Sequence, residues 1–411
     1  MTFSDQLCST LWGDVAKAAT QPLRSVRSAK PADSVKTPKA PSDRTAIFLL
    51  VPVATLVVVG LGAMLSASSV VALRADQSQL YFFNRQLVWT VLGVAAFLVT
   101  IRIPYRQYAK WAVPLFVVST VGLIAVLAIG DVRGGARRWI EIGPVTIQPS
   151  EFSKFATIVM LAMVLARKDR LLSDFAHFVI PILLTLGTTG GLLMLEPDFG
   201  TTMIIGLTGL AMLLASRAPL RYVTGLGAAG GLIGAFFAQS EDYRWRRLTS
   251  FLDPLSDRFG DGLQAVQSRI AIATGGWFGV GLGASRARWS FLPNAPTDFI
   301  FAIIAEEMGF AGAIVIVVLF VALAGVGVAI ALRAPDAFGR LLALGIVSWI
   351  SIQALINVGG VTVVLPITGV PLPFVSSGGS ALITNLAAIG VLVNIARSGR
   401  DSRSAPRARA R

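Results

Sequence analysis

The chain has 411 residues, of which 54% are hydrophobic and only 14% are charged, and its formal net charge is +14. Soluble proteins carry about 25% charged residues, so this composition excludes an ordinary soluble protein. Several apolar runs reach the roughly 20 residues that cross a bilayer, and the sequence therefore predicts an all-α polytopic membrane protein.

Positive charge is concentrated at the two ends of the chain. Residues 1–44 contain 7 of the 36 Lys and Arg residues, and the last 15 residues contain 6. Both ends are rich in Ser, Pro and Ala, which predicts disordered basic tails at 1–44 and 398–411. Such tails are expected to contact membrane lipids rather than nucleic acid. The only cysteine, Cys8, lies in the first tail, which excludes an intramolecular disulfide.

Between the tails, residues 45–397 contain about ten segments that are apolar enough to form transmembrane helices. They lie at 45–73, 86–101, 111–130, 152–166, 176–195, 199–216, 220–238, 298–332, 341–361 and 378–396. An even number of spans places both termini on the same side. A large loop, 240–297, separates the seventh span from the eighth.

The distribution of basic residues in the loops predicts the orientation. The short loops on the side of the termini carry 10 Lys and Arg in 30 residues, whereas the opposite loops carry 12 in 104 residues. The positive-inside rule therefore predicts cytoplasmic termini and an extracytoplasmic loop 240–297. We find no internal repeat, which weakens a transporter interpretation.

Two acidic motifs lie at the outer ends of spans. In QPSEFSK, Glu151 and Lys154 are three residues apart and share a helix face, so an internal ion pair and a functional site are both open interpretations. In LEPDFGTT, Asp198 follows Glu196 and Pro197 between two apolar runs. Asp198 either caps the following helix or has a functional role.

The large loop contains the motif YRWRRLTSFLDP. Its residues Arg244 and Arg247, with the neighbouring aromatic side chains, form either an interfacial belt or a clamp for phosphate groups. We favour the clamp because basic residues are otherwise sparse on this side. The lone histidine, His177, is expected to anchor the interface rather than bind a metal.

Polar residues also interrupt the last three spans. Asp298 begins the eighth span, and Glu306 is expected about eight residues in, or roughly 12 Å along the helix, near the middle of the membrane. In the ninth span, Gln353 and Asn357 are expected to hydrogen-bond between helices. Before the tenth span, the run at 376–380 (SSGGS) allows close backbone approach, for packing or for ligand contact.

The motifs GGARRWIEIGPVTIQPSEFSK, EPDFGTT, YRWRRLTSFLDP, LPNAPTDFIFAIIAEEMG and LPFVSSGGS occur in this order. Together they resemble the SEDS family of shape, elongation, division and sporulation proteins, which includes FtsW and RodA. The resemblance runs from about residue 45 to 397. This chain departs from the family pattern at Pro296, Ser377 and Ala381. The stretch FGVGLGASRARWSFLP and the basic N-terminal extension favour the division branch over the elongation branch.

The resemblance implies an enzyme of the bacterial cell membrane that polymerises lipid II into peptidoglycan glycan strands. It implies Asp198 as the general base that activates a sugar hydroxyl. Lys154, Arg244 and Arg247 would stabilise the pyrophosphate leaving group, with Glu151 orienting Lys154. Asp298 would shape the cavity or help to hold a metal.

The same resemblance implies substrate contacts from Ser376 and Ser377. A divalent cation such as Mg²⁺ or Mn²⁺ would be a cofactor, with no metal ligands assigned. The implied partners are a class B penicillin-binding transpeptidase and other membrane proteins of the division complex. Alternative functions are a RodA-type elongation polymerase, a lipid II flippase and a non-catalytic membrane scaffold.

Overall fold

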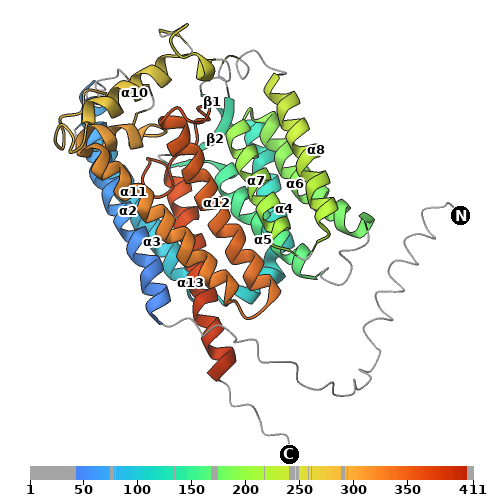
Figure 1. The fold of residues 1–411 in the computed structure, drawn as a ribbon. Coiled ribbons are helices and arrows are strands. Elements are labelled where there is room, and N and C mark those ends of the chain that lie inside the picture. Colours follow the sequence, from blue (N-terminus) through green and yellow to red (C-terminus); the bar gives the residue numbers. More distant parts are fainter. Residues whose placement is uncertain are drawn as a thin grey trace, which may run out of the picture. The chain divides into compact units, whose positions relative to one another are not determined.

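Ten long helices coincide with the ten apolar segments expected from the sequence (Figure 1). They are α2 (Asp43–Arg74), α3 (Tyr81–Thr100), α4 (Tyr105–Ile129), α5 (Pro149–Arg167), α6 (Phe175–Leu195), α7 (Phe199–Leu214), α8 (Leu220–Gln239), α11 (Ile300–Leu332), α12 (Ala337–Val361) and α13 (Gly379–Ser404). The structure is a computed structural model. It describes residues 43–74, 78, 80–133, 136–143, 145–167, 175–216, 218–239, 246, 250–257, 259–260, 262–287, 292–293 and 295–404.

Eight of these helices are long and apolar enough to cross a membrane. The other two, α6 and α7, contain shorter apolar stretches, Val179–Leu195 and Phe199–Leu214. At 1.5 Å per residue, each of these stretches spans about 25 Å, slightly less than the hydrocarbon core of a bilayer. The helical fold is confirmed, and the number of membrane crossings stays a prediction.

Burial identifies the centre of the bundle. In α5, 83% of the apolar window is buried, whereas the figure is 6% in α8, which packs on α7 at the edge. Four helices, α4, α6, α7 and α12, pack around α5. Elsewhere in the bundle, α13 packs extensively on α3. Because lipid is as apolar as the side chains, close packing and interhelical hydrogen bonds hold such a bundle together. Polar groups on α5 are therefore in a position to contact several helices.

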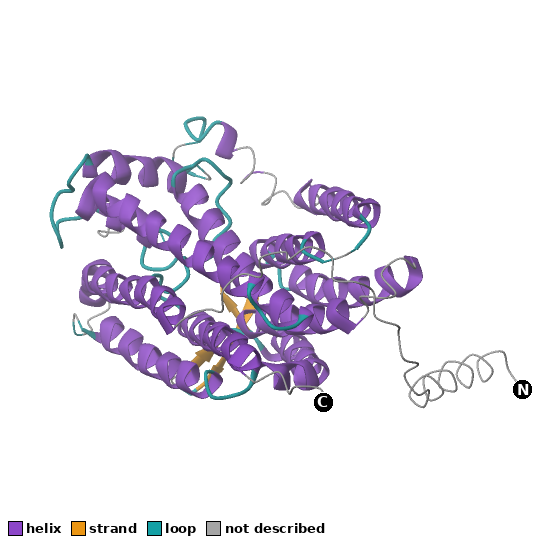
Figure 2. Cartoon of the chain, turned by 60° about the horizontal axis from the view of Figure 1, so that its bottom comes forward, coloured by secondary structure: helices purple, strands orange, loops and turns teal. Residues whose placement is uncertain are grey.

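A small antiparallel sheet follows α4 and was not expected from the sequence. It consists of β1 (Asp131–Arg133), β2 (Ala136–Ile142) and β3 (Val145–Ile147) in the order β1-β2-β3. Gly143 has φ of 61°, so the turn between β2 and β3 uses the left-handed region that glycine tolerates. The strands form a minor part among the helices (Figure 2).

The sheet lies at the same end of the bundle as α10 (Leu263–Gly275), and α13 finishes at the opposite end (Figure 1). This placement agrees with the loops predicted to share one side, and α10 belongs to the large loop 240–297. Residues 1–42 of the N-terminal tail lie outside the described residues. At the other terminus α13 continues to Ser404, so the helix extends past the tail boundary expected at residue 398. The run 398–404 contains no proline, and Pro406 follows it.

Candidate active site

A buried ion pair lies in the first two turns of α5. Pro149 opens this helix, where the N–H that proline lacks would have had no helical partner. Lys154 Nζ donates to Glu151 Oε1 at 2.9 Å and lies 2.8 Å from Oε2. Lys154 is 0% exposed and Glu151 is 2% exposed. The internal ion pair considered from the sequence is therefore present.

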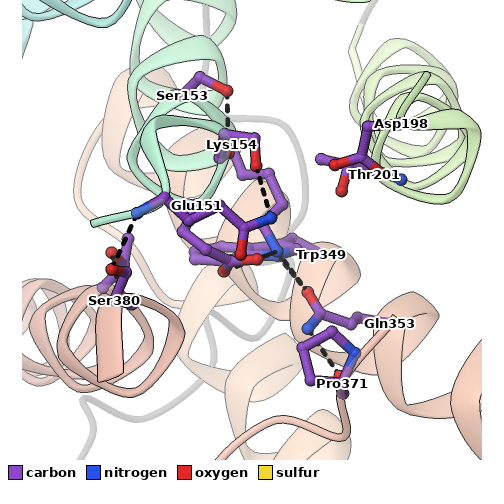
Figure 3. Close-up of polar contacts among 12 residues, drawn as sticks. Glu151, Ser153, Lys154, Asp198, Thr201, Trp349, Gln353, Pro371 and Ser380 are labelled. Carbon is purple, nitrogen blue, oxygen red and sulfur yellow. Dashed lines mark hydrogen bonds and ion pairs between the residues drawn. The ribbon is translucent and has the colours of Figure 1, made fainter. Parts of the chain in front are cut away.

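Gln353 on α12 connects this pair to the loop between α12 and α13 (Figure 3). Its Oε1 accepts hydrogen bonds from Lys154 Nζ at 2.8 Å and from Trp349 Nε1 at 2.9 Å. Its Nε2 donates to the carbonyl oxygen of Pro371 at 2.9 Å. Lys154 Nζ also lies 5.3 Å from the centre of the Trp349 ring. The ammonium group is thus surrounded by partners from the protein itself.

Asn357, one helical turn beyond Gln353, holds a second part of the same loop. Its Nδ2 donates to the carbonyl oxygen of Asp298 at 2.8 Å and to that of Val370 at 2.7 Å. The interhelical role expected from the sequence is confirmed for Gln353, which bonds to Lys154 of α5, whereas Asn357 bonds to the carbonyl oxygens of two loop segments. The side chain of Asp298 is partly exposed, and the residue immediately precedes Phe299, the N-cap of α11.

The serine-rich run uses its polar groups to stabilise the loop. Ser376 Oγ accepts from the amide of Leu372 at 2.8 Å, and Ser377 N donates to the carbonyl oxygen of Pro296 at 3.2 Å. Ser376 is 5% exposed and Ser377 is partly exposed. The loop between α12 and α13 thereby joins the segment that carries Asp298. Substrate contacts by Ser376 and Ser377 stay a prediction.

Asp198 caps α7. Its Oδ1 accepts from the amide of Thr201 at 3.2 Å, and the side chain is 5% exposed. Gly200 packs so closely against Thr368 and Val370 that a Cβ atom at this position would contact both residues. The capping alternative left open by the sequence is therefore realised, and α7 begins against the same loop. Among the contacts drawn in Figure 3, no dashed line joins Asp198 to Lys154.

A small cavity lies beside Lys154, between α5, α6, α7 and α12. Apolar side chains form most of its wall, together with Thr157, Thr208 and Trp349. Neither Asp198 nor Asp298 belongs to the lining. Lys154 therefore lines this cavity, whereas the two aspartates lie outside it.

Glu196 lies in the turn between α6 and α7 and is 0% exposed. Among the described residues, neither of its carboxylate oxygens has a hydrogen-bond partner. Burial and then the nearby carboxylate of Asp198 raise the pKa of Glu196 to about 8, although Arg138 opposes the shift. Arg138 of β2 donates to the carbonyl oxygens of Glu196 and Pro197. The sequence contained Glu196 in a motif but indicated no role for it.

Glu306 lies in α11 just before a kink, and its expected depth in the membrane stays a prediction. Gly309 has φ of 69° and ψ of −168°, so the helix direction changes three residues after Glu306. The Glu306 carboxylate accepts hydrogen bonds from Ser285 Oγ, from Arg286 N at 3.0 Å and from Ala287 N at 3.2 Å. Glu306 therefore anchors the large loop and does not stand isolated in the middle of a continuous membrane helix.

The same loop satisfies the main chain at the kink. Amides of Val280 and Gly281 donate to the carbonyl oxygens of Glu306 and Glu307, and amides of Phe310 and Ala311 donate to those of Gly276 and Trp277. Irregular backbone at membrane depth is tolerated only where such partners exist. The large loop and α11 thus form one hydrogen-bonded unit, and Asp298 lies just before α11.

Three of the predicted features cannot be placed. Arg244 and Arg247 lie outside the described residues, as does the side chain of His177. No cluster of three or more His, Cys, Asp and Glu side chains suited to a metal occurs in the described part of the chain. The structure thus brings Glu151, Lys154 and Gln353 together, and Gln353 bonds to the α12–α13 loop. Asp298 is connected to the same loop through Asn357, and Asp198 lies two residues before Gly200, which packs on that loop.

Comparison with known proteins gives consistent matches over most of the chain. Residues 46–401 match the family model for FtsW, RodA and SpoVE, described as cell cycle protein. Stage V sporulation protein E of Bacillus subtilis is 39% identical over 358 residues, which cover 86% of this chain and 97% of that protein. The probable peptidoglycan glycosyltransferase FtsW of Coxiella burnetii is 41% identical over 357 residues, which cover 85% of this chain and 95% of that protein.

Solved structures share the fold. A chain from a structure described as "Structural coordination of polymerization and crosslinking by a peptidoglycan synthase complex" has a TM-score of 0.70 and 28% identity, covering 85% of this chain and 97% of that chain. The rod shape determining protein RodA of Thermus thermophilus has a TM-score of 0.63 and 26% identity, covering 85% and 96%. The chain therefore belongs to the FtsW/RodA/SpoVE family, which is the SEDS family that its motifs resemble.

Proposed function

We propose that this protein is a peptidoglycan glycosyltransferase that polymerises lipid II during septal wall synthesis. It is a multi-pass protein of the bacterial inner membrane, as its apolar helices and its family indicate. Relatives that cover most of the chain are named as probable peptidoglycan glycosyltransferases of the FtsW type. The observation that carries the proposal is the hydrogen-bonded assembly of α5, α12, the α12–α13 loop and the segment before α11, which presents a partly exposed aspartate at one end of the bundle.

Glycan polymerisation requires attack of a sugar hydroxyl on an anomeric carbon, with a lipid pyrophosphate as the leaving group. The hydroxyl is a weak nucleophile, so a positioned carboxylate base contributes about 10² to 10⁴ in rate. Pyrophosphate departs without full protonation, and its developing charge is stabilised by cations. One accessible carboxylate and a set of basic groups therefore meet the chemical requirement.

Two aspartates are candidates for the base, and their environments differ. Asp198 is 5% exposed, and its carboxylate already accepts the amide of Thr201. Asp298 is partly exposed, and its position is fixed through its main chain by Asn357. A base must come within hydrogen-bond reach of the substrate hydroxyl. We therefore place the base at Asp298 and give Asp198, the choice favoured by the sequence, a capping role at α7.

Lys154 acts through the protein rather than on the pyrophosphate. Its contacts with Glu151 and Gln353 hold the α12–α13 loop through Pro371. Removing either charge would leave the other buried without its counter-charge, which is costly. Arg244 and Arg247 of the large loop remain the proposed cations for the leaving group, since a guanidinium offers a planar fork that matches phosphate oxygens.

A related structure is that of a peptidoglycan synthase complex whose description names both polymerization and crosslinking. We propose accordingly that this chain works with a class B penicillin-binding transpeptidase, which would crosslink the strands that it makes. The division role is proposed from the FtsW-type relatives. A RodA-type elongation role would use the same chemistry.

A flippase is less well supported by the geometry. Glu306, which was expected from the sequence near the middle of the membrane, is 2% exposed and is bound by residues 285–287. A carboxylate that is fully engaged by a loop is poorly suited to line a polar path across the membrane.

The deciding experiment supplies lipid II in detergent to the purified full chain with its transpeptidase partner, and resolves the products on a gel. A polymerase makes glycan ladders in detergent, whereas a flippase requires a sealed bilayer with two sides. Ladders that depend on this chain support the proposal. A folded complex that makes no polymer from lipid II would overturn it.

A further inference from the structure

We infer that the turn between α6 and α7 is a binding site for a divalent cation of the Mg²⁺ or Mn²⁺ class, with the side chains of Glu196 and Asp198 as ligands. The inference concerns binding by the protein alone. It does not rest on the proposed polymerase activity.

The first observation is the state of Glu196. Its side chain is 0% exposed, yet neither Oε1 nor Oε2 has a hydrogen-bond partner among the described residues. Buried polar atoms are almost always hydrogen-bonded, and a buried carboxylate without a partner is especially costly. A proton would occupy only one of the two oxygens. A cation bound by both oxygens would occupy the pair.

The second observation is the balance of charge around the turn. Glu196 and Asp198 contribute two carboxylates that interact electrostatically, and Arg138 is the basic group that acts on Glu196. The Arg138 guanidinium donates its hydrogen bonds to the main-chain oxygens of Glu196 and Pro197, not to the carboxylate of Glu196. Two acidic side chains thus meet one guanidinium at this turn, and that guanidinium is hydrogen-bonded to main-chain oxygens.

The third observation is the direction of the main chain. The turn follows the C-terminus of α6, where the carbonyl end of the helix dipole attracts cations. Arg138 already exploits this attraction through two carbonyl oxygens. A site for a metal ion at the same turn would use the side-chain oxygens that Arg138 leaves without hydrogen bonds.

The donor set fits a hard cation. Mg²⁺ and Mn²⁺ prefer oxygen ligands, and Mg²⁺ is commonly held by one or two carboxylates, with water or a phosphate completing the shell. Gly200 packs against Thr368 and Val370, so the turn lies beside the loop that Asn357 and Gln353 position. A cation here would add positive charge next to that loop.

The test uses the full chain in detergent, stripped of metal with EDTA and then titrated with Mn²⁺ in the absence of lipid II. Free Mn²⁺ is followed by its electron paramagnetic resonance signal. Wild type should bind one equivalent in a saturable manner, and excess Mg²⁺ should displace it. Glu196→Gln, which mimics the protonated acid and should therefore fold, is expected to lower the affinity at least tenfold.

Two further variants complete the comparison. Asp198→Asn, which preserves a good capping residue, should also weaken binding. Glu141→Gln, at an exposed acid on β2, serves as the matched control and should bind Mn²⁺ like wild type. Mn²⁺ should raise the melting temperature of wild type but not of Glu196→Gln. Absence of a saturable site in wild type, or unchanged affinity in Glu196→Gln, would overturn the inference.

Discussion

Lys154 on α5 donates a hydrogen bond of 2.8 Å to Gln353 on α12, and both side chains are fully buried. This contact links residues that are 199 positions apart in the sequence. Through Gln353 Nε2 it also reaches the α12–α13 loop at Pro371. The buried charge and the loop are therefore parts of one network.

Replacing Gln353 should show how much this network contributes. In Gln353→Leu, Lys154 and Trp349 each lose an acceptor, and the Pro371 carbonyl loses its donor. Each buried group left without a partner costs about 1–3 kcal/mol, so a marked drop in melting temperature is expected in detergent. Ser351→Ala is the control on the same helix. Ser351 Oγ has no partner among the described residues, and its removal should change the melting temperature little.

The ion pair itself is tested by single and double variants. Lys154→Met leaves Glu151 as a buried charge, and breaking such a pair costs about 3–5 kcal/mol. The double variant Glu151→Gln/Lys154→Met removes both charges and should unfold closer to the wild-type temperature than Lys154→Met does. Thermal unfolding of wild type, of Lys154→Met and Glu151→Gln alone, and of the double variant measures this coupling. Additive losses would show that the two residues act independently.

The kink in α11 predicts a different response at two glycines of one helix. A Cβ atom at Gly309 would collide with the main chain of residues 277–279, and its φ of 69° disfavours any other residue. Gly309→Ala should therefore destabilise the protein by about 1–3 kcal/mol. Gly325→Ala, where the new methyl group meets nothing within 4 Å, should be neutral or stabilising. Equal melting temperatures for the two variants would argue against the kink.

The buried acid at the α6–α7 turn predicts a dependence of stability on pH. The pKa of Glu196 is raised to about 8 in the folded protein. In the unfolded chain a glutamate titrates near about 4.3. Between these values the folded state holds a proton that the unfolded state has lost, so stability should fall as pH rises from about 5 to about 8 and then level off. Melting temperatures in EDTA should show this slope in wild type and a smaller one in Glu196→Gln. Parallel profiles would contradict the assignment.

The sequence predicted the helices well because long apolar runs have few alternatives in a membrane. The kink at Gly309 was missed because AIIAEEMGF reads as one helical run. The small sheet was missed because its strands are only three to seven residues long.

The site was only partly predictable, for a different reason. Glu151 and Lys154 are neighbours in the sequence, so their pairing could be inferred from helical spacing. Gln353 and Trp349 join them through tertiary contacts that no local pattern encodes. From the sequence alone, Asp198 could be either the N-cap of α7 or the general base. Only its burial and its bond to Thr201 indicate the cap.

The most direct test compares Asp298→Asn with Asp198→Asn for lipid II polymerisation in detergent, in complexes with matched melting temperatures and saturating Mg²⁺. Asp298→Asn removes the proposed base, and glycan synthesis should fall by about 10² to 10⁴. Asp198→Asn keeps the cap on α7, and its rate should stay within about tenfold of wild type. Undiminished ladders from Asp298→Asn, or complete loss confined to Asp198→Asn, would contradict the account.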